Sequence, residues 1–212
     1  MVFFVATDCG AADRSIGEPA SLTRKRALTV TIKIGVFIGS LSTASINRKL
    51  AKALMRLAPA GVEISEIEIK DLPLYNHDLD GAYPEVALEL KRQIEAADGV
   101  LYVTPEYNRS IPGGLKNAID WASRPWGQNS LGKPSATIGA SIGPISTAAA
   151  QQHLKNVLLF SDATVMAQPE GYIHFTEGLI ADDGEVTNEG TEQFLRGWMA
   201  TFVEFVEKQS RA

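Results

Sequence analysis

Apolar residues follow two alternating patterns along the chain from residue 31 onward. Runs rich in β-branched and aromatic residues predict strands, and stretches with an apolar residue every three or four positions predict helices. The predicted strands cover 32–38, 62–69, 99–103, 134–142 and 163–166. The predicted helices cover 46–57, 85–97, 114–122, 148–160 and 188–207, and the buried faces of the last two are expected to include Phe160 and Phe194. The segments 71–84 and 168–187 are rich in turn residues and predict irregular loops.

The regular alternation of strand and helix predicts one α/β domain over residues 31–210. Such alternation produces a parallel sheet with right-handed crossovers and helices on both faces, which is a three-layer sandwich. A five-stranded parallel sheet fits the flavodoxin-like order 2-1-3-4-5 better than the six-stranded dinucleotide-binding fold. The sequence shows no internal repeat and no second domain.

Residues 1–30 differ from this pattern and are interpreted as an N-terminal extension. The apolar opening segment has no basic residues before it and is too short for a secretory signal. The acidic residues Asp8, Asp13 and Glu18 are unlike a transit peptide. Disorder of the extension and packing on a neighbouring subunit both remain open.

Composition and charge narrow the function classes. The 212 residues are 45% hydrophobic, and the formal net charge is −5. We expect no nucleic-acid partner, because that would need a basic stripe. The single cysteine, Cys9, and three scattered histidines do not predict a metal site. No apolar run approaches the roughly 20 residues that span a membrane, so we expect a cytoplasmic protein without a membrane partner.

Three loops at the carboxyl end of the predicted sheet carry the candidate chemistry. In the order 2-1-3-4-5, the loops after the first, third and fourth strands meet where ligands bind. The first loop, 39–47, offers four hydroxyl groups at a helix N-terminus, which suits a phosphate. The alternative is that these hydroxyl groups only cap the helix. Neither G-x-x-x-x-G-K-[ST] nor G-x-G-x-x-G is present, so a nucleotide P-loop and Rossmann dinucleotide binding lack support.

The second loop, 104–110, suits a flat ligand that forms hydrogen bonds. Tyr107 offers an aromatic ring, and Glu106 and Asn108 offer polar atoms. The third loop, 141–147, contains Gly143, which lets the backbone approach a ligand closely. A phosphate at one loop and a planar polar ring between the other two describe flavin mononucleotide, FMN.

Three motifs also resemble those of the NADPH-dependent FMN reductases, most of all the branch with bacterial chromate and quinone reductases. They read GS-L-x-x-x-S-x-N, PEYN-x-S-x-PG-x-LKNAIDW-x-S-RP and G-x-S-x-G-x-x-x-T-x-x-AQ-x-HL. The resemblance covers about residues 32–207. It implies that FMN is contacted by Gly39, Ser40, Leu41, Ser42, Ser45, Ile46, Asn47, Pro105, Glu106, Tyr107, Asn108, Ser110, Ser141 and Gly143.

The same resemblance implies an oxidoreductase in which the flavin carries the chemistry and no side chain is catalytic. NADPH or NADH is then the cosubstrate, and hydride passes through bound FMN to a small-molecule acceptor with ping-pong kinetics. Quinones, free flavins, azo compounds and chromate are the acceptors it implies. From the residues, Glu106 is expected to bind backbone or a neighbouring subunit rather than to move protons. Homodimers or homotetramers are implied as well, and Tyr83, Trp126 and Ile111 are expected to form an exposed apolar cluster beside the site.

Two positions depart from the family pattern. Ser42 and Ala149 stand where the family commonly has arginine, which removes positive charge from the site. We still expect FMN to bind, through backbone amides and hydroxyl groups. Weaker FMN retention, or altered binding of NADPH or of an anionic acceptor, are the alternatives that these changes open, and chromate is the acceptor that they favour least. One alternative is a flavodoxin-like electron carrier, which would bind FMN without oxidising NADPH. A second is a protein of this fold that has lost its cofactor and binds partners.

Overall fold

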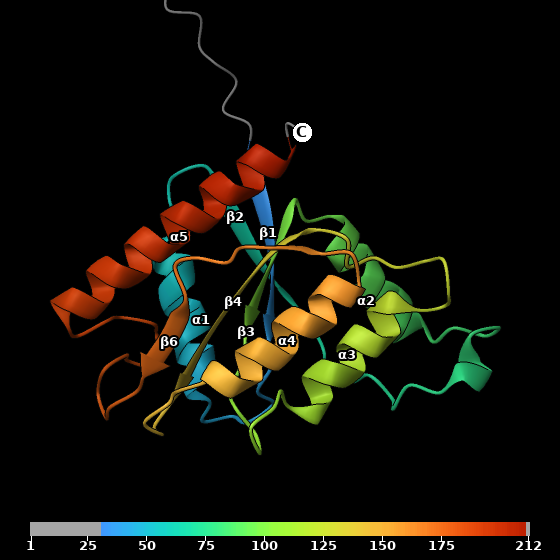
Figure 1. Ribbon diagram of the computed structural model, residues 1–212, viewed down its shortest axis with the longest axis horizontal. Coiled ribbons are helices and arrows are strands. Elements are labelled where there is room, and N and C mark those ends of the chain that lie inside the picture. The colour runs from blue at the N-terminus through green and yellow to red at the C-terminus, as the bar shows by residue number, and fades with distance from the viewer. Residues whose placement is uncertain (1–30, 211–212) are drawn as a thin grey trace, which may run out of the picture.

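The computed structural model describes residues 31–210 as a parallel sheet between two layers of helices (Figure 1). The predicted extension, residues 1–30, lies outside the described residues. The strand order is β2-β1-β3-β4-β5, which confirms the predicted order. The strands are β1 (Ile32–Ile38), β2 (Val62–Ile67), β3 (Gly99–Val103), β4 (Pro134–Ser141) and β5 (Thr164–Val165).

A sixth strand, β6 (Gly171–His174), also belongs to the sheet. It pairs in parallel with the carboxyl half of β4, whereas β5 pairs with the amino half of the same strand. The prediction of an irregular loop over 168–187 is therefore wrong for these four residues. A Cβ atom on Gly171 would lie only 2.5 Å from the Ile138 side chain, so a glycine lets this short strand approach β4.

The helices form two groups on opposite faces of the sheet. On one face lie α1 (Ile46–Leu57) and α5 (Glu189–Ser210), and on the other lie α2 (Glu85–Glu95), α3 (Gly113–Ser123) and α4 (Ala148–Phe160) (Figure 1). The residues of β1 divide between the two cores, because successive side chains point to opposite faces. Ile34 and Val36 pack with α1 and α5, whereas Phe37 packs with α2 and α3. A short 3₁₀ turn, η1 (His77–Leu79), interrupts the connection before α2.

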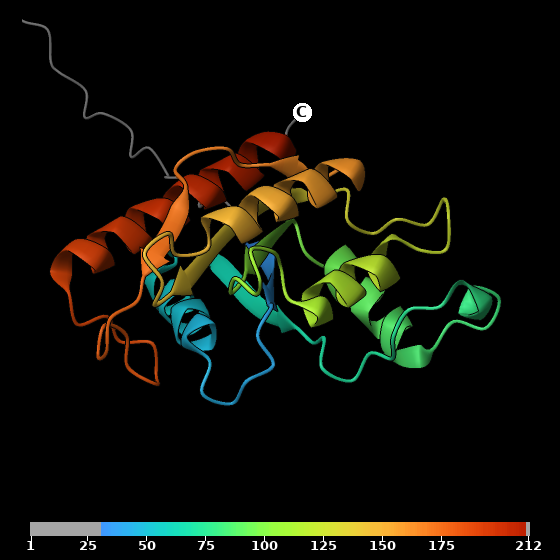
Figure 2. The ribbon, with the colours of Figure 1, turned by 60° about the horizontal axis from the view of Figure 1, so that its bottom comes forward.

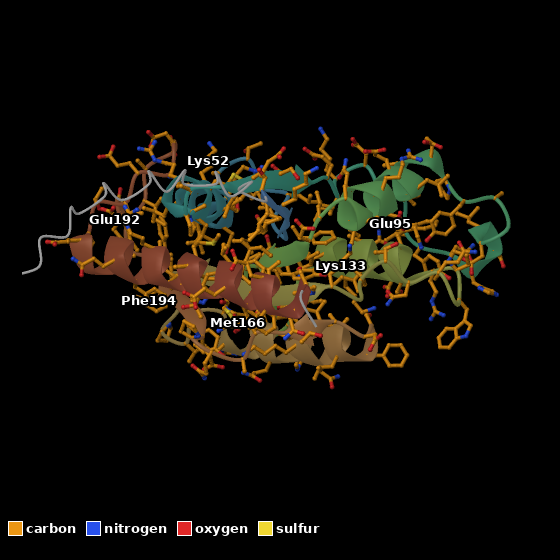
Figure 3. The ribbon with its side chains drawn as sticks, turned by 90° about the horizontal axis from the view of Figure 1, so that it is seen from above. Lys52, Glu95, Lys133, Met166, Glu192 and Phe194 are labelled. Atoms are coloured by element: carbon orange, nitrogen blue, oxygen red, sulfur yellow. The ribbon has the colours of Figure 1, made fainter. Side chains whose placement is uncertain are left out.

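Several apolar side chains are not where the periodicity placed them. Phe160, expected inside, is 80% exposed at the end of α4, and Phe194 on α5 is 40% exposed. Figure 3 labels Phe194, together with the buried Met166. Tyr83 and Ile111, expected at the surface, are half-buried against the core of α2 and α3. Only Trp126 of the expected exposed cluster is largely exposed.

The connection after α3 is anchored by a buried lysine. Lys91 on α2 donates to the main-chain oxygens of Arg124, at 2.6 Å, and Gln128. Tyr83 donates from its hydroxyl group to the same Arg124 oxygen at 2.9 Å, and Lys91 lies over the Tyr83 ring. Burial lowers the pKa of Lys91. The lysine thus acts as a donor to the 124–128 backbone. Within residues 31–210, no helix is long and apolar enough to cross a membrane.

We expect Lys91→Met to lower the free energy of unfolding by about 2 kcal/mol, since the Arg124 and Gln128 carbonyl oxygens lose their shared donor. Urea unfolding followed by circular dichroism measures the change. Lys208→Met is the matched control, because that lysine is 75% exposed on α5. Identical unfolding midpoints for the two variants would show that Lys91 does not anchor the connection.

Candidate active site

The loops that follow β1, β3 and β4 meet at one edge of the sheet, as predicted. Figure 2 turns this edge, the lower one in Figure 1, toward the viewer. Backbone hydrogen bonds hold the strand ends together: Gly39 donates to Val103 at 2.8 Å, and Thr104 donates to Ile138 at 3.0 Å. Every predicted cofactor-binding residue lies on these loops, at the last residue of β4 or at the start of α1.

Glycine permits the close approach of the loops. A Cβ atom on Gly39 would meet Leu115 at 3.2 Å and Thr104 at 3.3 Å. A Cβ atom on Gly139 would overlap the main-chain oxygen of Thr104 and the side chain of Thr147. Larger residues at either position would therefore force the three loops apart.

Asn47 joins the first loop to the third. Its side chain is 1% exposed, donates to the main-chain oxygen of Ala140 and accepts from the Ala140 amide, both at 2.9 Å. The side chain thus faces the end of β4 from the first turn of α1. This arrangement makes Asn47 a positioning residue for the site, through the backbone that it holds.

The hydroxyl groups of the first loop divide into two pairs. Ser45 caps α1, accepting from the Arg48 amide at 3.1 Å, and the buried Ser40 accepts from the Ser42 amide at 3.4 Å. Ser42 and Thr43 are exposed. The capping alternative therefore accounts for Ser45 but not for the whole set. The first turn of α1 contains no acidic residue, so no carboxylate of the helix itself offsets its positive dipole end.

The second loop folds back on itself in a tight turn. Tyr107 and Ser110 exchange two backbone hydrogen bonds, at 2.9 and 3.0 Å. Between them, Asn108 and Arg109 have positive φ angles of 51° and 64°, a conformation that costs energy for residues other than glycine. The turn presents the Tyr107 ring, which is 51% exposed.

Glu106 fastens this turn to α4. Its side chain is 8% exposed, accepts from the Ala150 amide at 3.1 Å and pairs with Arg109 at 3.2 Å. Thr147, at the N-cap position of α4, makes no capping bond, because its hydroxyl group accepts from Gln151 instead. Glu106 therefore caps a helix from another loop. Its contact to a backbone amide agrees with the structural role expected from the sequence.

The third loop adds apolar side chains that the sequence reasoning did not select. Ser141 accepts from the Gly143 amide at 3.1 Å, which shapes a small turn. Ile142 within that turn is 77% exposed, and Ile145 is 45% exposed. Ile142 had been assigned to the end of the predicted strand 134–142, but β4 ends one residue earlier, at Ser141. For Ile145, the signal in the sequence was a large apolar residue isolated between small ones in a predicted loop.

Together, the three loops present Leu41, Tyr107 and Ile142 as exposed apolar groups at one edge, beside free hydroxyl groups and a helix N-terminus. This combination fits a planar ring joined to a phosphate. His153 on α4 lies 3.1 Å from the Ser110 hydroxyl group and was also not predicted. Among residues 31–210, no group of three or more His, Cys, Asp or Glu side chains is arranged to hold a metal ion.

Residues 32–178 match the model of the NADPH-dependent FMN reductase family. The chain is 49% identical over 178 residues to a 2-hydroxy-1,4-benzoquinone reductase of a Burkholderia species, an alignment that covers 84% of this chain and 97% of the relative. It is 41% identical over 185 residues to a quinone reductase of Escherichia coli, covering 84% of this chain and 96% of the relative.

The chain is also similar to proteins of solved structure. The flavoenzyme NAD(P)H:(acceptor) oxidoreductase FerB of Paracoccus denitrificans superimposes with a TM-score of 0.80 at 50% identity, covering 84% of this chain and 98% of that chain. A flavodoxin of Pseudomonas aeruginosa superimposes with a TM-score of 0.52 at 19% identity, covering 83% of this chain and 99% of that chain. The second likeness shows a flavodoxin-like fold and nothing more.

We expect Glu106→Ala to lower the free energy of unfolding by about 1 kcal/mol, the usual cost of a lost helix cap, and to speed hydrogen exchange of the Ala150 amide. Glu106→Gln keeps an acceptor oxygen and should lie near the wild type. Glu89→Ala, in an exposed pair on α2, is the control. Unchanged exchange at Ala150 in Glu106→Ala would contradict the capping role.

Proposed function

The chain belongs to the NADPH-dependent FMN reductase family, and from that premise we propose that it is a quinone reductase. FMN and NAD(P)H are its cofactor and cosubstrate. The observation that carries the proposal is the open apolar edge formed by Leu41, Tyr107 and Ile142 beside the N-terminus of α1, whose first turn contains no acidic residue. Relatives named as quinone reductases, at 41–49% identity, support the same acceptor class.

The proposed FMN contacts follow the three loops. The phosphate and ribityl chain lie against Gly39, Ser40, Leu41, Ser42, Ser45, Ile46 and Asn47. The ring lies against Pro105, Glu106, Tyr107, Asn108, Ser110, Ser141 and Gly143. Backbone amides and the helix dipole hold the phosphate in place of the arginines that Ser42 and Ala149 replace.

The residues of this chain bind and orient FMN and the substrates. FMN, when bound, supplies the chemistry of accepting and donating hydride. Glu106 is committed to the Ala150 amide and to Arg109, so it holds the Tyr107 turn and serves as no proton donor. Because one open edge serves both NAD(P)H and the acceptor, we propose that they bind in turn, with ping-pong kinetics. Quinones match the apolar edge best, and free flavins and azo compounds are planar molecules as well. Chromate is an anion, and the site lacks the arginines that would attract it.

We further propose that residues 31–210 act as the catalytic domain of a cytoplasmic homodimer, which could pair into a homotetramer. A groove of about 640 Å³ runs between α3 and α4, and it continues into a second hollow beside Trp126. Leu159 and Phe160 line it and are 64% and 80% exposed, and Trp126 is 78% exposed. Side chains this large and apolar at one surface suit burial against a second copy.

Steady-state kinetics of the FMN-loaded protein with varied NADPH and 1,4-benzoquinone test the proposed function. We expect parallel double-reciprocal lines, and an anaerobic flavin absorbance that NADPH bleaches and quinone restores. A flavin band that NADPH leaves unchanged would assign the protein to electron carriers instead. A protein that retains no flavin would contradict the cofactor site itself, and chromate turnover equal to quinone turnover would contradict the acceptor preference.

Phe160→Glu tests the dimer surface. We expect it to raise the dimer dissociation constant by about a hundredfold or more, since a charge would enter an apolar interface. Sedimentation velocity over a dilution series measures the change, and Leu88→Glu, half-exposed on α2, is the control. An unchanged oligomeric state in Phe160→Glu would place the interface elsewhere.

A further inference from the structure

A cluster of basic residues on α1 lies beside the first loop and outside the FMN contacts. Arg48, Lys49 and Lys52 line a cavity of about 340 Å³ with Thr43, Ser45 and Asp182. Figure 3 labels Lys52 on α1. Because Thr43 and Ser45 also belong to the first loop, the cavity adjoins the proposed phosphate site of FMN.

A hairpin from a distant part of the chain closes one side of this cavity. Ile180 and Val186 pair in an antiparallel bridge, and Gly184 at the turn has a φ of 90°. A Cβ atom on Gly184 would lie 2.7 Å from the Ala53 amide nitrogen, so the hairpin packs directly on the α1 backbone. This packing brings Asp182, at the hairpin tip, to the basic cluster.

One cation of the cavity, Lys52, has no carboxylate partner within residues 31–210. Glu66 holds Arg48 through two bonds of 2.6 and 2.8 Å, and Asp182 pairs with Lys49 at 2.7 Å. Lys52 donates at 2.6 Å to the main-chain oxygen of Asp182, which carries no charge. Among the described residues, no carboxylate lies within ion-pair distance of Lys52. Of the three cations, two form ion pairs (3 − 2), so Lys52 is left without an ion-pair partner in the described part of the chain.

The Asp182 carboxylate lies at this cavity but is held only weakly there. Its side chain is 92% exposed, so water and salt screen its pair with Lys49. A phosphate monoester brings up to two negative charges and three acceptor oxygens, against the single charge of a carboxylate. Such a group would bring negative charge to Lys49 and Lys52 together, whereas the Asp182 carboxylate pairs with Lys49 alone.

We propose that this cavity binds the 2′-phosphate of NADPH, with Lys49 and Lys52 as its cationic partners and Asp182 as the carboxylate it displaces. The inference rests on the proposed function and specifies which cosubstrate the site prefers. NADH carries a hydroxyl group in place of this phosphate and gains nothing from the two lysines. The cavity adjoins the first loop, so it can receive the adenosine half of a nucleotide whose nicotinamide reaches the FMN site.

Calorimetric titration of the FMN-loaded protein with 2′,5′-ADP and with 5′-ADP tests the site without turnover. We expect 2′,5′-ADP to bind about tenfold more tightly, and this ratio to fall about fivefold in Lys49→Gln and in Lys52→Gln. Asp182→Asn should raise the preference for 2′,5′-ADP over 5′-ADP. This variant guards against misfolding as an explanation, because a misfolded protein would not bind more tightly. Arg196→Gln, in an exposed pair on α5, should match the wild type.

Equal binding of the two nucleotides by the wild type, or a ratio that the three variants do not change, would overturn the inference. The ratio of kcat/KM for NADPH to that for NADH should move in the same direction in each variant. Equal use of NADPH and NADH, with quinone still reduced, would overturn this inference and leave the proposed function intact. Failure of both cosubstrates to bleach the flavin would instead overturn the proposed function.

Discussion

The pair of hydrogen bonds between Asn47 and Ala140 is the interaction on which the site depends. It ties the start of α1 to the end of β4 in a fully buried place, where an unpaired amide would be costly. Because the first loop precedes α1 and the third loop follows β4, this contact fixes the distance between the two loops. The close approach at Gly39 and Gly139 then places the second loop between them.

The electrostatics of the site come from backbone more than from side chains. The two arginines near the loops are paired, Arg109 with Glu106 and Arg48 with Glu66. In the proposed FMN site, the phosphate faces the N-terminus of α1, which has no acidic residue in its first turn. The N-terminus of α4 differs, because Glu106 already occupies it. Two helices that point at the same edge therefore have different roles, one open to a ligand and one closed by the protein itself.

Much of the fold could be predicted from periodicity, because each strand and helix buries one face and leaves a matching pattern in the sequence. The helix over 148–160 begins and ends at the predicted residues. The four residues of β6 were missed because their pairing depends on β4 and on the close approach at Gly171, not on a local pattern. The exposure of Phe160 was missed because periodicity shows spacing but not which neighbour covers the end of a helix.

By itself, the sequence determined the α/β fold, the strand order and the three loops of the candidate site, since these follow from hydrophobic spacing and from motifs at strand ends. Only the tertiary structure decided what individual side chains do. Asn47 holds β4, Glu106 caps α4 across 44 positions of the chain, and Asp182 meets the basic residues of α1 across 133 positions. Contacts between residues so far apart leave no local pattern in a single sequence, so they become visible only when folding brings the segments together.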